Sequence, residues 1–368
     1  MTRILIVGGG IAGAATALAA DKAGFSPVLF EGHPASGADI GAFLTLAHNG
    51  FAVLKELGTA EAVAAAGFAQ TELSVIAQNG DVVATRPMRE SHCLRRAELC
   101  RVLQAAVIGR GIPLYHGKSL VSVSEDAAGV TAGFADGDSA RGDLLVGADG
   151  LNSTVRRLLD PAVTPRYAGQ RVFYGYTTKA APPPDPAGMV MVRGSSVAFG
   201  YTVSPAGETY WFGRTHGPEL SAAEIAAPGW RDHLVRLLED DRTPAAAIVA
   251  ATDEPLLVTN ACDLPEVPRW RTGRVVLVGD AAHAASPATG QGASMALEDA
   301  IVLAKALRDT AKPLEVYERL RRPRVAANIA ASARMTAGAT NTVQRPAEPR
   351  PADDQLGRVL EWNTVLEG

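Results

Sequence analysis

The first part of the chain alternates between apolar runs and segments with helical spacing. Residues 4–7 form a continuous apolar run, which is typical of a strand buried on both faces of a parallel sheet. Residues 12–23 show the spacing of a helix, and residues 28–31 predict a second strand. Together these elements make a βαβ unit, the usual opening of a dinucleotide-binding domain.

The pattern of apolar runs returns later in the chain, after a region of different composition. Residues 171–214 contain short strands rich in aromatic residues, at 172–178, 197–203 and 209–214, and this spacing favours an antiparallel sheet. Apolar spacing also predicts further strands at 144–149 and 273–280, a hairpin at 121–134, and helices at 51–57, 223–238, 294–307, 314–335 and 356–366.

We therefore expect an α/β fold in which a Rossmann-like nucleotide-binding domain is interleaved with a second domain built on a mainly antiparallel sheet, with C-terminal helices. The expected boundaries are 1–75, 96–170 and 265–345 for the nucleotide-binding domain, 76–95 and 171–264 for the substrate domain, and 346–368 for a linker and C-terminal helix.

The composition is that of a folded globular protein. Of the 368 residues, 47% are hydrophobic and 20% charged, and the net charge of -4 gives no basic excess that would favour a nucleic acid or an anionic membrane. Cys93, Cys100 and Cys262 are too widely spaced to indicate a disulfide framework or a metal site, so a cytoplasmic location is expected. The uncharged stretch 4–20 is too short for a membrane span, and its central glycines favour a strand-to-helix turn over a signal peptide.

The first chemical motif is Gly8-x-Gly10-x-x-Gly13, between the first predicted strand and the first predicted helix. Gly8 permits a tight turn, Gly10 lets a pyrophosphate approach the backbone, and Gly13 lets the helix pack on the strand. Glu31 ends the second strand, where a carboxylate can accept hydrogen bonds from ribose hydroxyl groups. The motif predicts dinucleotide binding, and the charge of Glu31 disfavours NADP at this site.

Two further motifs follow predicted strands. Asp280, in Gly-Asp-Ala-Ala-His, stands at the end of the strand predicted at 273–280, just after its buried apolar run, and its carboxylate suits the hydroxyl groups of a ribityl chain. The glycines of residues 287–292 precede a helix, which suits a flavin pyrimidine edge that gains negative charge on reduction. Asp149, in Gly-Ala-Asp-Gly, can either organise its turn or contact a cofactor, and both interpretations stay open.

In this order and spacing, the three motifs resemble those of the FAD-dependent class A monooxygenases, the p-hydroxybenzoate hydroxylase-like family. The resemblance covers Arg3 to about Arg334, and in length the chain is similar to the compact salicylate-, urate- and tetracycline-type members. It implies that Arg96 lies on the FAD phosphate side and Leu120 beside the adenine. The full set of implied cofactor-binding residues is Gly8, Gly10, Ile11, Ala12, Gly13, Glu31, Arg96, Leu120, Asp149, Asp280, Pro287, Gly290, Gln291 and Gly292.

The resemblance also implies a reaction. NADH or NADPH docks transiently and reduces FAD, and the reduced flavin captures oxygen as a C4a-hydroperoxide that transfers one oxygen atom to an aromatic or polycyclic small molecule. Hydroxylation, epoxidation and Baeyer-Villiger oxidation stay open, and no catalytic base is assigned. We expect a monomer or homodimer with no nucleic-acid or membrane partner.

This chain departs from the family pattern in two places. Residues 31–50 contain no Arg or Lys, although many relatives carry an arginine there, and Phe43 replaces a small residue in the stretch beside the flavin. Phe43 is therefore expected to change ring placement or substrate access. On the aromatic strand, Tyr174 and Tyr176 share one face and Phe173 the other. The candidate substrate-lining residues are Phe43, Tyr176, Phe199, Tyr201, Tyr210, Phe212 and Arg214.

Other flavoproteins share this fold. A flavin-dependent halogenase is disfavoured because the Trp-x-Trp-x-Ile-Pro signature is absent: Trp211, Trp230, Trp270 and Trp362 stand apart. A non-redox accessory protein that uses FAD as a scaffold is a second alternative, and it predicts bound FAD without reduction by NAD(P)H.

Overall fold

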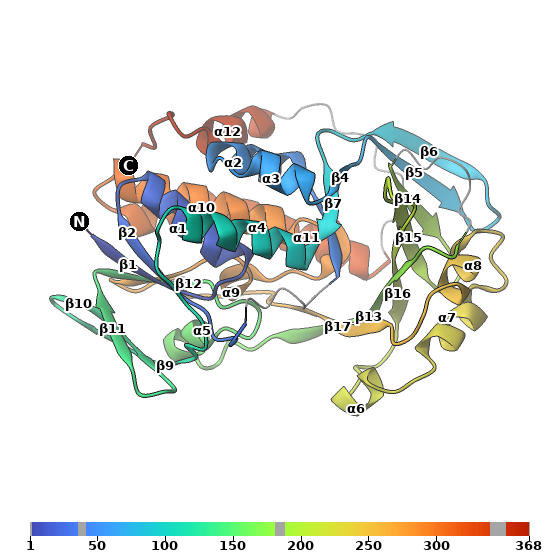
Figure 1. The fold of residues 1–368 in the computed structure, drawn as a ribbon, viewed down its shortest axis with the longest axis horizontal. Helices are drawn as coiled ribbons and strands as arrows, with labels where there is room; N and C mark the ends of the chain where they lie inside the picture. Colours follow the sequence, from blue (N-terminus) through green and yellow to red (C-terminus); the bar gives the residue numbers. More distant parts are fainter. Residues whose placement is uncertain (1, 36–41, 181–187, 339–350, 368) are drawn as a thin grey trace.

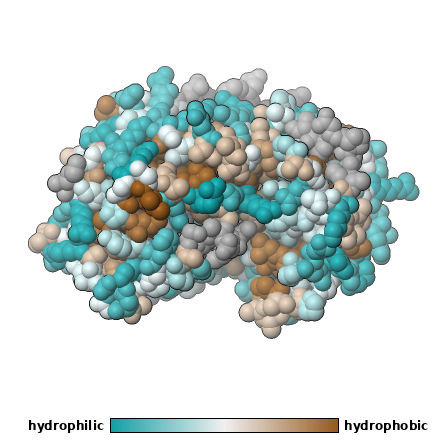
Figure 2. Space-filling view, viewed as in Figure 1, coloured by the Kyte–Doolittle hydropathy of each residue, from teal (hydrophilic) through white to brown (hydrophobic). Residues whose placement is uncertain are grey.

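The computed structural model describes residues 2–35, 42–180, 188–338 and 351–367. Helices and a parallel sheet form one part of the molecule, and a larger sheet forms the other (Figure 1). Strands β13 and β17 run between the two parts (Figure 1). The outline of the molecule is indented between the parts along its lower edge (Figure 2).

The parallel sheet contains the strands whose apolar runs predicted burial on both faces. Ile4, Leu5 and Ile6 are completely buried, and β1 pairs in parallel with strands on both sides. This arrangement confirms the expected Rossmann-like sheet. Among the described residues its order is β18 (Val275–Leu277), β12 (Leu144–Gly147), β1 (Arg3–Val7), β2 (Ser26–Phe30) and β8 (Leu114–Tyr115).

A layer of helices lies beside this sheet. The alanine-rich helix α1 contacts both α4 and α10, and α10 also contacts α2 and α11. Ala14, Ala15 and Ala17 are completely buried, because small side chains let neighbouring helices approach closely. The helices of this part are α1 (Ile11–Lys22), α2 (His48–Glu56), α3 (Ala60–Ala65), α4 (Arg96–Gly109), α5 (Thr154–Leu159), α9 (Asp280–His283), α10 (Gly292–Asp309), α11 (Pro313–Thr336) and α12 (Pro351–Leu360).

The second part is built on a large sheet that is antiparallel except where β14 pairs in parallel with β5. One face carries Phe173 and Trp211 and is covered by α7 (Trp230–Leu238) and α8 (Ala245–Ala250). The other face points toward β3. Among the described residues its order is β17 (Leu257–Asp263), β13 (Arg166–Thr177), β16 (Thr209–His216), β15 (Ala198–Val203), β14 (Gly188–Arg193), β5 (Glu72–Ala77) and β6 (Val82–Pro87).

Two small antiparallel sheets complete the described fold. The predicted hairpin forms β9 (Leu120–Asp126) and β10 (Gly129–Phe134), with β11 (Ser139–Gly142) beside β10. The second small sheet lies between the helices and the large sheet, and there β7 is the central strand (Figure 1). Its strands are β3 (Phe43–Leu46), β7 (His92–Arg95) and β4 (Phe68–Ala69).

The structure corrects two of the predicted helices. The helix expected at 223–238 is broken into α6 (Ala222–Ile225) and α7, because Pro228 and Gly229 lie between them and Gly229 has a φ of 92°. The helix expected at 356–366 begins earlier and ends at Leu360. Its end is held by Lys305, whose Nζ donates to the backbone oxygens of Val359 and Glu361.

The residue boundaries of the two domains stay a proposal. Strand β5 starts at Glu72, before the expected boundary at 76, and β7 pairs with β3 and β4 rather than with the large sheet. The first residues of the expected linker, 346–350, lie outside the described residues. Over the part of the chain that is described, no helix is both long enough and apolar enough to cross a membrane.

Candidate flavin and substrate site

The three glycine-containing motifs lie against one another at the carboxyl ends of β1, β12 and β18. A Cβ on Gly8 would lie 2.4 Å from the backbone oxygen of Ala148, and one on Gly13 would lie 1.8 Å from the backbone oxygen of Gly8. A Cβ on Gly279 would lie 2.9 Å from the Cβ of Ala12. Segments far apart in sequence therefore pack closely here, and this edge of an open α/β sheet is where ligands bind.

The same loops also present backbone to open space. Apart from the adjoining residues and the backbone of the same helix, no described atom lies within 4 Å of a Cβ built on Gly10, Gly290 or Gly292. Gly10 and Gln291 are the N-cap residues of α1 and α10, and neither caps its helix with a side chain. Because helix N-termini favour negative charge, these two helix starts fit a pyrophosphate and a flavin pyrimidine edge. The residues present therefore fit FAD.

Glu31 shapes the loop that would hold the adenosine. One carboxylate oxygen accepts the backbone N–H of Gly9 at 2.5 Å, and the other accepts that of His33 at 2.7 Å. The backbone oxygen of Glu31 accepts the N–H of Lys118 at 2.8 Å, which brings Leu120, the first residue of β9, close to the same loop. Leu120 is buried in the core. The chain just before β9 thus lies against the end of β2.

Asp280 and Pro287 begin two short helical segments after β18. Asp280 is the first residue of α9, is exposed, and its carboxylate has no hydrogen-bond partner among the described residues. Pro287 is also exposed and begins the short 3-10 helix Pro287–Thr289 that precedes α10. An exposed carboxylate at the end of a parallel strand can accept hydrogen bonds from hydroxyl groups of a ligand.

Helix α4 carries Arg96 to the edge of the glycine loop. Arg96 is its exposed first residue, and Gln104, two turns further on, donates from Nε2 to the backbone oxygen of Gly9 at 2.7 Å. The thiol of Cys100 lies between them and faces the backbone of Ile11, the buried first residue of α1. Gln104 was missed from the sequence, although its spacing from Arg96 places both residues on one helix face.

Asp149 organises its own turn in this structure. Its carboxylate accepts the hydroxyl of Ser153 at 2.5 Å and the backbone N–H of Thr154 at 2.7 Å. Burial raises the pKa of Asp149, although these hydrogen bonds oppose the shift. Arg156 in the helix that follows donates from Nη1 to the backbone oxygen of Ala281 at 3.1 Å. The turn is thereby tied to the Asp280 loop, and cofactor contact by Asp149 stays a prediction.

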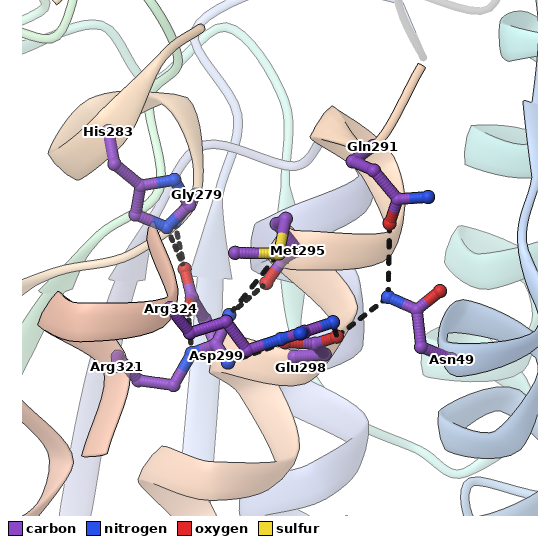
Figure 3. A network of polar contacts seen from close by, with 9 residues as sticks. All are labelled: Asn49, Gly279, His283, Gln291, Met295, Glu298, Asp299, Arg321 and Arg324. Atoms are coloured by element: carbon purple, nitrogen blue, oxygen red, sulfur yellow. Dashed lines mark hydrogen bonds and ion pairs between the residues drawn. The ribbon is translucent and has the colours of Figure 1, made fainter. Parts of the chain in front are cut away.

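A buried polar network on α10 and α11 lies behind these loops (Figure 3). Glu298 and Asp299 are both completely buried, and Arg321 donates to Asp299 at 2.7 Å and to Glu298 at 2.5 Å. Arg324 adds a second cation to Glu298. Burial alone would raise the pKa of Asp299, but His283 and Arg321 hold it at about 2. The arginines likewise lower the pKa of Glu298 against the effect of burial.

The network holds in place the two loops that carry Asp280 and Gln291 (Figure 3). Asp299 accepts the backbone N–H of Gly279 at 2.7 Å, directly before Asp280. Asn49 donates from Nδ2 to Glu298 at 2.6 Å and to the side-chain oxygen of Gln291 at 3.2 Å. Neither Asn49 nor the arginines were identified from the sequence. The one signal was a pair of consecutive acids in the otherwise apolar run 295–304.

An aromatic cage, which we define as Tyr174, Tyr176, Tyr210 and Phe212, faces β3 from the large sheet. The ring of Phe43 lies 5.6 Å from that of Tyr210 and 6.2 Å from each of the other three, measured between centroids. Phe43 is buried, with 7% of its surface exposed. Burial raises the pKa of both Tyr174 and Tyr176 to about 12, so their hydroxyl groups stay protonated.

Arg95 covers the outer side of the cage. Its guanidinium lies 4.4 Å from the ring centroid of Tyr176 and 5.6 Å from that of Tyr210, and it forms an ion pair with Glu208 at 2.9 Å. Cation–π contacts of this kind hold a charged group over an aromatic face. Arg95 is the direct partner of Phe43 in the β3–β7 pairing, so it belongs to the same site, and sequence reasoning missed it.

Arg214 lies at the inner end of the cage. It is two residues beyond Phe212 on β16, and its guanidinium lies 5.6 Å from the Phe212 ring. Only 8% of Arg214 is exposed, and its Nε and Nη1 atoms have no hydrogen-bond partner among the described residues. Burial lowers the pKa of this guanidinium, while Tyr174 opposes the shift.

Two predicted lining residues lie elsewhere. Phe199 and Tyr201 are at most 2% exposed and pack in the core between the sheet and α7 and α8. The register pairs Gly200 with Phe212, so residue 200 is on the cage face and its neighbours are on the opposite face. The ring of Phe199 stacks on Trp211 at 5.4 Å. Their assignment as lining residues is therefore corrected to core residues.

Comparisons with known proteins agree with this arrangement. The profile of a family described as an FAD binding domain matches residues 1–332. An aurachin C monooxygenase/isomerase of Stigmatella aurantiaca is 31% identical, over 83% of this chain and 80% of its own length. A 3-amino-4-hydroxybenzoate 2-monooxygenase of Streptomyces platensis is 30% identical, over 88% of this chain and 85% of its own length.

The fold has a close counterpart among solved structures. An FAD complex of a Klebsiella pneumoniae HpxO variant superposes with a TM-score of 0.83 at 27% identity, covering 92% of this chain and 91% of the other. The matched profile, the relatives and the convergence of the three glycine motifs lead to one assignment. The chain is a flavoprotein monooxygenase and belongs to the FAD-dependent class A monooxygenases.

Proposed function

We propose that this enzyme uses NADH or NADPH to reduce bound FAD and then inserts one oxygen atom from O2 into an aromatic small molecule. The relatives described above are monooxygenases, and one of them is named for an aminohydroxybenzoate substrate. These names favour oxygen insertion over halogenation or a scaffold role for FAD.

The observation that carries the proposal is the position of β3. Its first residue, Phe43, lies in the aromatic cage of the large sheet. Just beyond its last residue, the N–H of Ala47 lies 3.3 Å from the hydroxyl of Ser294, and Asn49 contacts Gln291. Strand residues rise about 3.3 Å each, so the step from Phe43 to Ala47 is roughly 13 Å. One short strand therefore links the ring-lined cage to the loop suited to a flavin edge.

The residues of the chain have separate tasks in this reaction. The start of α1 would hold the pyrophosphate, Glu31 the ribose, Asp280 the ribityl chain, and the start of α10 the pyrimidine edge. When bound, FAD supplies the redox chemistry with NAD(P)H and O2. The buried cage orients the substrate ring and excludes water, which would otherwise divert the reaction to hydrogen peroxide.

Rapid-mixing absorbance measurements test this proposal. The purified protein is reduced anaerobically with NADH or NADPH and then mixed with oxygenated buffer. We expect loss of the oxidised flavin bands in the first step, then a transient absorbing species before oxidised FAD returns. If neither nucleotide reduces the flavin, even with aromatic compounds present, the monooxygenase proposal fails and the scaffold alternative is favoured.

A further inference from the structure

Phe43 occupies the centre of the aromatic cage. Its ring meets those of Tyr174, Tyr176 and Tyr210 edge-on, with centroids 5.6–6.2 Å apart. Aromatic rings prefer this arrangement at these distances. The cage therefore already holds a six-membered ring, and that ring comes from β3 rather than from the large sheet.

Beside the cage is a charged group that forms no ion pair with any described residue. Only 8% of the surface of Arg214 is exposed, and two of its guanidinium nitrogens have no hydrogen-bond partner among the described residues. A buried, unpaired cation is costly, and buried polar groups in packed cores are almost always hydrogen-bonded. This contrasts with Arg321, which is 1% exposed and bonds to two carboxylates. Arg214 thus has the character of a ligand-binding group.

Strand β16 fixes the spacing between the ring of Phe212 and the guanidinium of Arg214. Phe212 and Arg214 are two residues apart on one face of β16, which corresponds to about 7 Å along a strand. The Phe43 ring lies 6.2 Å from the Phe212 ring, and the Arg214 guanidinium lies 5.6 Å from that same ring. A planar ligand whose ring takes the place of Phe43 can therefore direct an anionic substituent toward the guanidinium. Guanidinium groups bind carboxylates and similar planar anions with paired hydrogen bonds.

We propose that Phe43 occupies the ring-binding subsite of this enzyme, and that a substrate ring enters the cage only when Phe43 leaves it, with its anionic group bound to Arg214. This inference rests on the proposed function for the identity of the ligand as a substrate. Phe43 is then a specificity-determining residue, because the ease of displacing its ring limits which ring systems can bind.

Benzoate is the probe for this proposal, because it is a single ring with one carboxylate. Binding to the FAD-loaded protein is measured by calorimetry for the wild type, Phe43→Ala and Phe199→Ala. We expect Phe43→Ala to bind benzoate at least tenfold more tightly than the wild type, because no buried ring has to be displaced. Phe199→Ala is the matched control: it removes the same atoms from the opposite face of the sheet, away from Arg214, and should bind like the wild type.

The role of the cation is tested separately. In the Phe43→Ala background, benzoate should bind at least tenfold more tightly than neutral benzamide, and an added Arg214→Met substitution should abolish that preference. If Phe43→Ala does not fold, Phe43→Leu takes its place. Phe43→Leu should bind benzoate more tightly than the wild type, by a smaller factor than the tenfold expected for Phe43→Ala. A crystal structure of the wild type soaked with benzoate should show the Phe43 ring outside the cage.

Three outcomes would overturn the inference. They are equal benzoate affinity in the wild type and the folded Phe43 variant, equal affinity for benzoate and benzamide, or a benzoate complex with Phe43 still in the cage. None of these measurements involves reduction of the flavin. A failure here is therefore distinguishable from a failure of the proposed function, which the rapid-mixing experiment detects.

Discussion

The Nε atom of Arg321 donates to Oδ1 of Asp299 at 2.7 Å, in an ion pair that is almost fully buried between α11 and α10. Asp299 also accepts the backbone N–H of Gly279, so this pair lies directly behind the loop that carries Asp280 (Figure 3). Through Glu298 and Asn49 the same network reaches Gln291 in the loop before α10. The relative position of the two loops therefore depends on charges that do not themselves face the ligand.

Removing the arginine of this pair should destabilise the protein strongly. Arg321→Met leaves Glu298 and Asp299 buried with their main cation missing, and breaking a buried pair in this way costs about 3–5 kcal/mol. Urea denaturation of the apoprotein measures the loss. Arg101→Met is the control, since Arg101 pairs with Glu98 on the exposed surface of α4 and should unfold at nearly the wild-type urea concentration. Equal effects of the two substitutions would contradict the importance of the network.

The network should also make stability depend on pH in the acid range. The pKa of Asp299 is lowered from 3.8 to about 2 in the folded protein. A carboxylate with a depressed pKa stabilises the fold above its unfolded pKa, and this contribution is lost as pH falls from about 4 toward 2. The loss should be about 2 kcal/mol.

Urea midpoints measured at intervals between pH 7 and pH 2 test this dependence. The decline for Asp299→Asn should be shallower than for the wild type between about pH 4 and pH 2. Asp240→Asn serves as the control, because Asp240 is an exposed carboxylate that forms no ion pair with any described residue. Parallel curves for the wild type and Asp299→Asn would show that this carboxylate does not titrate as expected.

Gly10→Ala should separate cofactor binding from folding. A Cβ at Gly10 meets no described atom within 4 Å, and its φ of -71° suits alanine. The apoprotein should therefore change in stability by no more than about 1 kcal/mol. FAD affinity should fall clearly, because the methyl group occupies the space through which a pyrophosphate would approach the loop. Fluorescence titration of the apoprotein with FAD measures this affinity.

Gly109→Ala is the matched control for that substitution. Gly109 ends α4, and a Cβ there also meets no described atom within 4 Å. Its substitution should leave FAD affinity unchanged. If Gly10→Ala binds FAD as tightly as the Gly109 variant does, the pyrophosphate does not approach Gly10.

Asp280→Ala should weaken FAD binding on the order of 10- to 100-fold, the effect of losing hydrogen bonds to a charged group. Because its carboxylate has no partner among the described residues, the apoprotein should keep its stability. Glu31→Ala differs, since it also leaves the N–H groups of Gly9 and His33 unpaired. It should therefore lower both FAD affinity and the stability of the apoprotein. Unchanged FAD affinity in Asp280→Ala, measured by fluorescence titration, would remove Asp280 from the site.

Sequence patterns predicted the structure correctly where that structure depends only on neighbouring residues. The apolar run at 4–7 became the central buried strand, and the glycine motifs came together as expected because only residues without a side chain permit such close backbone contact. The predicted helix at 223–238 was wrong at the one place where a local signal, Pro228-Gly229, was overlooked. Strands β5 and β14 were missed. Each pairs with a strand close in sequence, but their parallel pairing with each other joins segments more than a hundred residues apart, which no local pattern predicts.

The sequence by itself determined the family, the Rossmann-like sheet and the glycine loops at its edge, since these follow from glycines, helix starts and apolar runs that act over a few neighbouring residues. Only the tertiary structure decided which aromatic residues form the cage. The pairing of Gly200 with Phe212 excludes Phe199 and Tyr201 from it. The tertiary structure also brought Phe43 into the cage, and it left two guanidinium nitrogens of the buried Arg214 without a hydrogen-bond partner among the described residues. These features depend on strand register and on contacts between distant segments, and neither is specified by any local pattern.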